Sequence, residues 1–413
     1  MTKPFESYNY TLEVVTPVHI GGAKENDYLR GSDFYYDDDT KEYVFFNQST
    51  FLKALNNQQL KEYTNALRKG DIDESEKISS VICGKNPTFV INRSYCPFFK
   101  SGARYDAKSR REVSTYYDDI RRHYSTGLGK LTIPGSSIKG ALRSVIGNYI
   151  INEANIRPKE NRDFDSIFGR ISGNLMHYLQ VSDVELGTTS SIIPFKTFSG
   201  DIKNSVRVTP NGLEYEGKGM WKFQSGQGER THEIDFKEEG FVFLYETCIM
   251  GSIGNLRLNW AKGLNELTPE NKKPNNYRYY DAIYGNTWMG IARKQMNTYL
   301  EQEIVYFKKF PNSDFSNSVE LLEKLQQINN EPNSILLRIG MGSGYHAITG
   351  NWRFKDHTQT GQAERKNRET RQFEKINAIK YKTRKVSFIE DSTEDLDSIW
   401  IDLPGFVKIT HKT

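Results

Sequence analysis

Leu131 to Ser144, LTIPGSSIKGALRS, carries residue types that bind phosphate at the start of a helix. A nucleotide-binding P-loop follows its second glycine with Lys and a hydroxyl residue, whereas here Lys139 precedes Gly140. The order of these residues argues against an NTPase. A simpler anion site stays open, because Ser136 or Ser137 can cap a helix whose first N–H groups are unpaired and partially positive.

Helical spacing gathers the small, hydroxylated and basic residues of this segment on one side. At about 100° per residue that side holds Ser136, Lys139, Gly140, Arg143 and Gly147. Such a face lets a sugar-phosphate backbone come close while the two cations neutralise its charge. The alternative is an ordinary capped helix with two solvated cations.

A second candidate is the glycine-rich stretch 339–350, IGMGSGYHAITG, which follows an apolar strand. Successive glycines expose backbone amides and let a ligand approach closely. The residues concerned are Gly340, Gly342, Ser343, Gly344, Tyr345 and Gly350. A dinucleotide site is disfavoured, because the glycines do not run GxGxxG into a helix and no acidic residue follows about 20 positions on. The alternative is a flexible hairpin connection.

Histidines offer a third possibility for chemistry. His19 ends the first apolar segment and precedes Gly21 and Gly22, where an imidazole could lie beside a ligand. His123 and His346 are the other candidates for a general base, although none has a recognisable set of partners. The seven histidines lack helical zinc spacing, so we expect neither a metal nor another cofactor.

Two basic stretches could contact RNA or a neighbouring protein, and the residues leave both readings open. Residues 100–124 mix seven Lys/Arg with tyrosines, which suits base stacking combined with phosphate contact. Residues 362–385 hold nine Lys/Arg against three Glu.

The elements that must position these residues mix strands and helices without the regular spacing of a barrel, which predicts an α+β fold. A first strand ends at Pro17 or Ile20, a hairpin spans 33–47, and a helix with a Ser or Thr cap follows. The helix of the phosphate-like motif should run from about 136 to 154. We expect a first domain at 1–187 with an insertion around 87–129, and a second domain at 188–413.

Composition bounds the environment of the protein. The chain has 413 residues, a net charge of +4 and three cysteines without a CxxC pair, which suits a reducing compartment. Its mean hydropathy is −0.67 and it has no apolar run of about 18 residues. We therefore expect a cytoplasmic protein that does not contact membranes.

Five motifs in a fixed order resemble the RAMP superfamily, the repeat-associated RNA-binding proteins of CRISPR effector complexes. They are LEVVTPVHIGG, IPGSSIKGALRS, FGR at 168–170, VSDVEL at 181–186 and IGMGSGYHAITG. Length and the glycine-rich ending are most similar to the fifth subunit of the type III-A (Csm) complex. The resemblance implies RAMP architecture, with two ferredoxin-like (RRM-type) modules in the two halves.

The resemblance also implies a non-catalytic subunit that binds crRNA, caps the filament at its 3′ end and supports crRNA maturation in antiviral defence. Its implied partners are crRNA, the backbone subunits and host trimming nucleases. The expected RNA-binding residues are His19, Gly21, Gly22, Ser136, Ser137, Lys139, Arg143, Gly340, Gly342, Ser343, Gly344 and Tyr345.

The resemblance does not lead us to expect that this chain cuts RNA. The loop after the first strand offers Asp27 and Asp33 but no convincing match to the RNA-cutting aspartate of the backbone subunits. Two alternatives remain open: a metal-independent endoribonuclease that uses His19 or His346 on precursor crRNA, and a purely structural capping subunit.

Overall fold

The structure is a computed structural model of the chain. It describes residues 5–22, 26–96, 100–106, 111–116, 119–156, 167–169, 174–201, 206–209, 212–215, 218–221, 243–262, 276–308, 316–344, 360–366, 373–379, 383–390 and 399–412.

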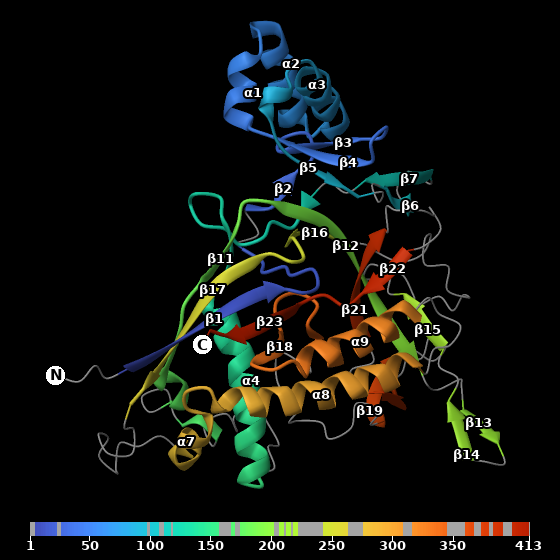
Figure 1. The fold of residues 1–413 in the computed structure, drawn as a ribbon. Helices are drawn as coiled ribbons and strands as arrows, with labels where there is room; N and C mark the ends of the chain where they lie inside the picture. Colours follow the sequence, from blue (N-terminus) through green and yellow to red (C-terminus); the bar gives the residue numbers. More distant parts are fainter. Residues whose placement is uncertain are drawn as a thin grey trace.

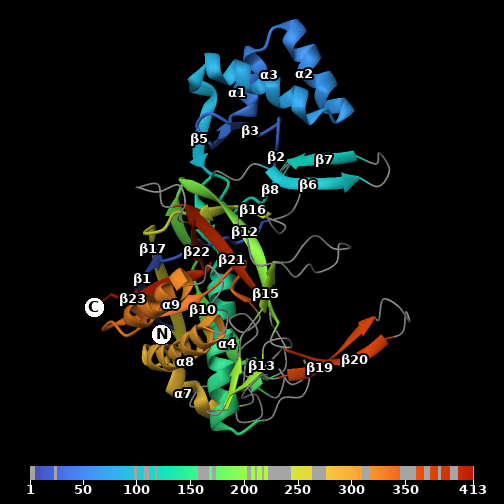
Figure 2. The same cartoon turned by 90° about the vertical axis from the view of Figure 1, so that its right-hand side faces the viewer.

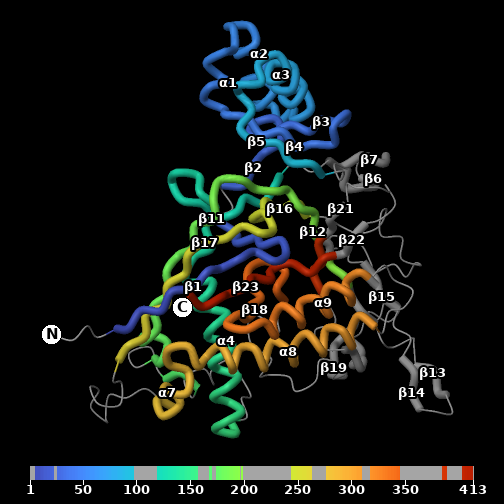
Figure 3. Tube along the Cα trace, viewed as in Figure 1, coloured from blue at the N-terminus to red at the C-terminus, as the bar shows by residue number. Residues whose placement is uncertain are grey.

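A five-stranded antiparallel sheet forms the centre of the molecule (Figure 1). Its strands, in spatial order, are β10 (Leu179–Val181), β17 (Ile253–Ala261), β1 (Phe5–Val14), β23 (Phe406–His411) and β18 (Ser334–Arg338). In β1 the alternate residues Tyr10, Leu12 and Val14 are fully buried, because successive side chains of a strand point to opposite faces. The first and last strands, blue and red in Figure 3, lie side by side.

Two long helices cover one face of this sheet. They are α4 (Gly135–Glu153) and α8 (Thr287–Lys308), and both contribute to one core cluster with β1. In chain order β1, α4, β10, β17, α8 and β23 follow the β-α-β-β-α-β pattern of a ferredoxin-like fold. The α+β class is therefore confirmed.

The expected boundary at residue 187 does not separate two sheets. β1 and β10 precede it and β17, β18 and β23 follow it, yet all five share the central sheet. β1 pairs with β17 on one side and β23 on the other. Among the described strands, one ferredoxin-like unit is thus assembled from both halves of the chain.

A second sheet lies beside the first and is organised around the long strand β12 (Ser190–Asp201). Its partners are β15 (Lys218–Trp221), β16 (Phe243–Cys248) and β21 (Thr383–Glu390), and β21 also pairs with β22 (Ile399–Asp402). The C-terminal half of α8 and helix α9 (Ser316–Asn329) pack against it through a second core cluster. α8 therefore bridges the two cores.

A buried ion pair fixes β21 to α8. Arg384 Nε and Nη2 donate to Glu303 Oε2 and Oε1 at 2.7 and 2.8 Å, and the guanidinium lies 4.1 Å from the centre of the Tyr306 ring. Glu303 is 0% and Arg384 5% exposed. The end of the basic stretch 362–385 is thus a strand of the core, and Arg384 is neutralised within the chain.

A small helical unit projects from the core (Figures 1 and 2). It consists of the sheet β3 (Phe34–Asp37), β4 (Glu42–Phe46) and β5 (Val90–Tyr95), and of helices α1 (Gln48–Ala54), α2 (Asn57–Lys69) and α3 (Ile72–Lys85). The hairpin expected at 33–47 is confirmed. The expected Ser or Thr cap is wrong, since Asn47 accepts from the Thr50 N–H group.

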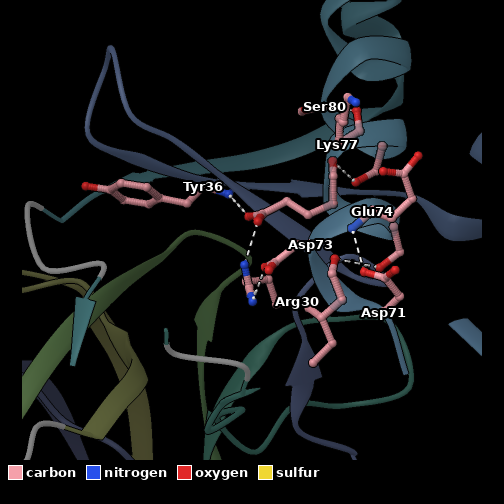
Figure 4. Close-up of polar contacts among 11 residues, drawn as sticks. Arg30, Tyr36, Asp71, Asp73, Glu74, Lys77 and Ser80 are labelled. Atoms are coloured by element: carbon pink, nitrogen blue, oxygen red, sulfur yellow. Dashed lines mark hydrogen bonds and ion pairs between the residues drawn. The ribbon is translucent and has the colours of Figure 1, made fainter. Parts of the chain in front are cut away.

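An arginine fastens α3 to the segment before β3 (Figure 4). Arg30 Nη1 contacts Glu76 Oε2 at 2.7 Å and Nη2 contacts Asp73 Oδ1 at 2.8 Å. Glu76 Oε1 also accepts from the Tyr36 N–H group at 2.9 Å. Gly31 lies close by at φ 76°, and a Cβ there would meet Ser75 Oγ at 2.2 Å. The helical unit is therefore joined to the β-structure by a tight, charged contact.

The remaining elements are short. They are β2 (Tyr28–Leu29), β6 (Lys100–Asp106), β7 (Arg111–Tyr116), β8 (Asp119–Ile120), β9 (Leu131–Ile133), β11 (Val184–Gly187), β13 (Val206–Thr209), β14 (Gly212–Tyr215), β19 (Thr360–Lys366), β20 (Phe373–Ile379), α7 (Tyr280–Ile283), η2 (Pro87–Phe89), η5 (Leu175–Tyr178) and η7 (Tyr277–Tyr279).

Candidate nucleic-acid interface

The glycine-rich loop folds onto the end of the first apolar segment. Gly340 has φ 73°, and a Cβ on it would lie 2.4 Å from the His19 carbonyl oxygen. The N–H group of the next residue, Met341, donates to that same oxygen at 2.8 Å. The structure therefore brings His19 and the start of the loop together across more than 300 residues of chain.

The side chain of Arg338 anchors the loop through hydrogen bonds to backbone carbonyl oxygens. Its Nη2 donates to the Gly342 carbonyl oxygen at 3.0 Å and its Nε to the Pro404 carbonyl oxygen at 2.9 Å. Ser343 is fully buried and its hydroxyl donates to the Gly340 carbonyl oxygen at 2.6 Å. Residues 340–344 are thus ordered by specific contacts rather than forming a flexible connection. Tyr345, His346 and Gly350 lie outside the described residues.

A lysine and three large side chains form a surface next to this loop, which we call the Lys385 surface: Lys385, Met341, Phe243 and Tyr245. Lys385 Nζ lies 3.2 Å from Met341 Sδ, and 5.8 and 5.9 Å from the ring centres of Phe243 and Tyr245. Phe243 and Met341 are each 37% exposed. Burial lowers the pKa of the Lys385 ammonium group.

In the described part of the chain, no carboxylate lies within ion-pair distance of Lys385. A partly desolvated ammonium group without a counter-ion attracts an anion from solution. Of the two neighbouring rings, Phe243 is exposed and offers a surface on which a base can stack, whereas Tyr245 is buried beneath it. The surface thus combines the two chemical features that bind single-stranded nucleic acid.

His19 lies beneath this surface and is 2% exposed. Its Nδ1 lies 2.7 Å from the Glu246 carbonyl oxygen, which only accepts, so Nδ1 carries the proton. The ring packs against Tyr245 with the centres 4.7 Å apart. Burial lowers the pKa of His19 to about 4. The neighbouring Gly21 and Gly22 are exposed and leave the backbone open to a ligand.

His123 is similarly enclosed. Its Nδ1 lies 3.0 Å from the Tyr124 carbonyl oxygen, and its Nε2 accepts from the thiol of Cys248 at 2.9 Å. Burial, assisted by the nearby His19, lowers the pKa of His123 to about 3. Both rings are neutral at physiological pH and are very weak proton acceptors, so neither is suited to general-base catalysis.

The two depressed pKa values predict a fall in stability on mild acidification. Below pH 6.5 the unfolded chain binds protons that folded His19 and His123 exclude, so the free energy of unfolding decreases as the pH falls towards 4. The slope reaches about 1.4 kcal/mol per pH unit for each histidine. Urea denaturation between pH 7.5 and 5 measures it.

His19→Asn keeps a donor for the Glu246 carbonyl oxygen and should flatten that pH dependence by one histidine's share. The exposed His177→Asn is the matched control and should leave the slope as it is in the wild type. An unchanged slope in His19→Asn would contradict the depressed pKa.

The start of α4 differs from the expected anion site. The helix begins at Gly135 and neither serine caps it; instead the Gly135 N–H group donates to Asp183 Oδ1 at 2.7 Å. A Cβ on Gly135 would lie 2.2 Å from the Val181 carbonyl oxygen, so the helix start is pressed against the segment that follows β10. The predicted cap by Ser136 or Ser137 is therefore wrong. The anion at this helix end is a carboxylate of the chain itself.

The basic side of α4 is partly covered. Ser136 and Gly140 are exposed and Ser137 is half-buried. Lys139 is half-buried, and the Arg143 guanidinium lies 4.9 Å from the centre of the Phe168 ring. Burial lowers the pKa of both cations.

Gly147 does not belong to an accessible face, because it is buried and its Cβ would meet Phe168 at 2.9 Å. The helix motif, FGR and VSDVEL thus form one group through Phe168 and Asp183. Within the described residues, no hydrogen bond links this group to the glycine-rich loop. The sequence motifs therefore make two groups rather than one site.

The Lys385 surface was missed in the sequence because its members come from three distant segments. Lys385 was noted only as the last residue of the basic stretch, and Phe243 and Tyr245 belong to none of the motifs. No local pattern identifies such a combination, since strand pairing brings the residues together: Phe195 of β12 faces Phe243 on one side and Ser387 on the other.

Known proteins similar to this chain were compared with it. The family model of the RAMP superfamily matches residues 11–353. The curated relative "CRISPR system Cms protein Csm5" of Enterococcus italicus is 28% identical over 155 residues, which cover 34% of this chain and 42% of the relative. The match thus spans less than half of the relative's length. In the described part of the chain, no helix is long and apolar enough to cross a membrane.

Two solved structures share the fold. A chain of a Csm–crRNA–target RNA ternary complex of a type III-A CRISPR-Cas system aligns with a TM-score of 0.56 at 14% identity, covering 98% of this chain and 100% of that one. The crystal structure of Csm5 from T. onnurineus aligns with a TM-score of 0.50 at 13% identity, covering 83% and 90%. These two structures show a shared fold, and the family match over residues 11–353 shows that the chain belongs to the RAMP superfamily.

Proposed function

We propose that the chain is a non-catalytic, crRNA-binding subunit of a type III-A CRISPR effector complex. In this role it caps the filament at the crRNA 3′ end, contacts the backbone subunits and supports crRNA maturation by trimming nucleases. The similarity to Csm5 and to a chain of a Csm–crRNA–target RNA complex supports this assignment.

The observation that carries the proposal is the Lys385 surface beside the glycine-rich loop. Its ammonium group has no carboxylate partner among the described residues, and the exposed Phe243 ring lies within reach. The loop is held by Arg338 and the His19 carbonyl oxygen, so little ordering is needed when RNA binds. Lys139 and Arg143 on α4 would supply further phosphate contacts.

The histidine environments support a non-catalytic role. A metal-independent ribonuclease needs a base whose pKa lies near the working pH, and the pKa values of His19 and His123 lie far below it. Both rings are also tied to backbone carbonyl oxygens in the core.

Binding of labelled crRNA to the purified chain, measured by fluorescence anisotropy at several salt concentrations, tests the proposal. Lys385→Ala should weaken binding about five- to tenfold, and removing one phosphate contact should reduce the salt slope by about 0.7. Lys139→Ala combined with Arg143→Ala should also weaken RNA binding and reduce its dependence on salt.

Lys324→Ala is the matched control, because Lys324 is an exposed lysine on α9 that pairs with Glu320. Equal affinities of Lys385→Ala and Lys324→Ala would contradict the assigned surface. A shortened RNA product that is absent with His346→Ala would contradict the non-catalytic role.

A further inference from the structure

A separate pocket of about 310 Å³ opens where the helical unit meets the core. β4 and β5 of that unit contribute Phe45 and Ile91, β2 contributes Tyr28, and the core contributes Arg122, Leu128 and Glu246. The volume lies at the lower end of the about 300–1,000 Å³ typical of small-ligand sites. It suits a single planar ring system.

Glu246 supplies a buried acceptor to the pocket. Its carboxylate accepts hydrogen bonds from the Ser190 hydroxyl at 2.9 Å, the Tyr28 hydroxyl at 3.3 Å and the backbone N–H group of His123 at 2.9 Å. A carboxylate has about four acceptor positions, so one remains. Because burial raises the pKa of Glu246, a further donor would relieve an unfavourable desolvation.

Arg122 supplies the donor. Its neighbour Arg121 is engaged, since its guanidinium pairs with Asp27 and lies 3.7 Å from Asp119. The Arg122 guanidinium instead lies 5.0 Å from the centre of the Tyr28 ring and, in the described part of the chain, has no hydrogen-bond acceptor. The pocket therefore presents unsatisfied donors beside one remaining acceptor position.

The mouth of the pocket is apolar. Leu128 is 85% exposed at the tip of the turn between Thr126 and Lys130, and Ile91 on β5 is 64% exposed. Exposed apolar side chains at the rim of a pocket provide a surface that a ligand can cover. Both can contact the faces of a planar ring.

We propose that this pocket binds one unstacked nucleobase of RNA, through an edge that carries an N–H donor beside an acceptor atom. The N–H group donates to Glu246 and the acceptor receives from Arg122, while Leu128 and Ile91 contact the ring. The inference rests on the proposed RNA binding but concerns a different part of the surface from Lys385. An aliphatic side chain of a protein partner fits less well, because it would bury Arg122 without an acceptor.

Saturation-transfer NMR of the full chain with AMP, CMP, GMP, UMP and ribose 5-phosphate tests the pocket. The nucleotides should bind about tenfold more tightly than ribose 5-phosphate, which has no base, as expected for one good pair of hydrogen bonds to a base edge. Arg122→Ala and Glu246→Gln should abolish that preference. Leu128→Ser, at an exposed turn, should weaken all four nucleotides without unfolding the chain.

Arg93→Ala is the charge-matched control, because Arg93 lies on β5 but pairs with Glu42 and does not line the pocket. Lys385→Ala should weaken the binding of long RNA while the preference for nucleotides over ribose 5-phosphate persists. If long RNA binds but monophosphates do not, and Arg122→Ala equals Arg93→Ala, the pocket inference is overturned and the proposed function stands. If long RNA does not bind at all, the proposed function fails. If Arg122→Ala instead releases a protein subunit from the assembled complex, the occupant of the pocket is protein and the inference is wrong.

Discussion

Glu303→Ala should lower the free energy of unfolding by about 3–5 kcal/mol, because it leaves Arg384 buried without its counter-ion. The Glu303 carboxylate is fully buried and accepts both guanidinium hydrogen bonds, so its removal leaves the Arg384 guanidinium without these two acceptors. Urea denaturation followed by circular dichroism at pH 7 measures the change.

Two further variants show how much of this loss of stability comes from the burial of the ion pair and how much from the unpaired charge. Glu320→Ala removes an exposed partner of Lys324 and should cost less than about 1 kcal/mol. Glu303→Met combined with Arg384→Met should recover most of the loss, since an apolar pair of similar volume needs no desolvation. A loss below 1 kcal/mol in Glu303→Ala alone would contradict the buried pair.

Gly340→Ala should release the glycine-rich loop and weaken crRNA binding about tenfold. A methyl group there combines a left-handed backbone at φ 73° with a 2.4 Å approach to the His19 carbonyl oxygen. The backbone conformation alone costs about 1–2 kcal/mol, and the collision must displace Met341 from that oxygen as well. Hydrogen exchange at residues 338–344 and anisotropy with labelled crRNA measure the two effects.

Gly344→Ala provides the control for backbone strain without a collision, because φ is 78° there and, among the described residues other than its chain neighbours, no heavy atom lies within 4 Å of the added Cβ. It should cost about 1 kcal/mol and leave the contact between Met341 and His19 intact. If the two variants exchange hydrogen equally, the close approach at Gly340 has no role in holding the loop.

Local patterns predicted the elements well where one residue type decides the conformation. The hairpin expected at 33–47 is the β3–β4 hairpin, whereas the first strand, expected to end at Pro17 or Ile20, ends at Val14. The start of α4 was correctly placed to within one residue, yet its cap was not, because Asp183 lies 48 positions away. A cap supplied from a distant segment leaves no local signal.

The domain boundary and the candidate site illustrate the same limit. Tyr10 pairs with Leu256 on one side and His411 on the other, and nothing near Tyr10 encodes either partner. Gly340 was singled out as a glycine that lets a ligand approach, whereas the group closest to it is the His19 carbonyl oxygen. The contacts of these motifs thus follow from tertiary packing rather than from the local sequence.

The position of β1 between β17 and β23 has a consequence for synthesis on the ribosome. Both neighbours of β1 are translated long after it, the nearer beginning at Ile253 and the other at Phe406. At about 5–20 residues per second, β1 waits roughly 12–50 s with both edges unpaired and roughly 20–80 s before its second edge is paired. Its hydrophobic face is open to chaperones during that time, and prematurely terminated chains cannot complete the sheet.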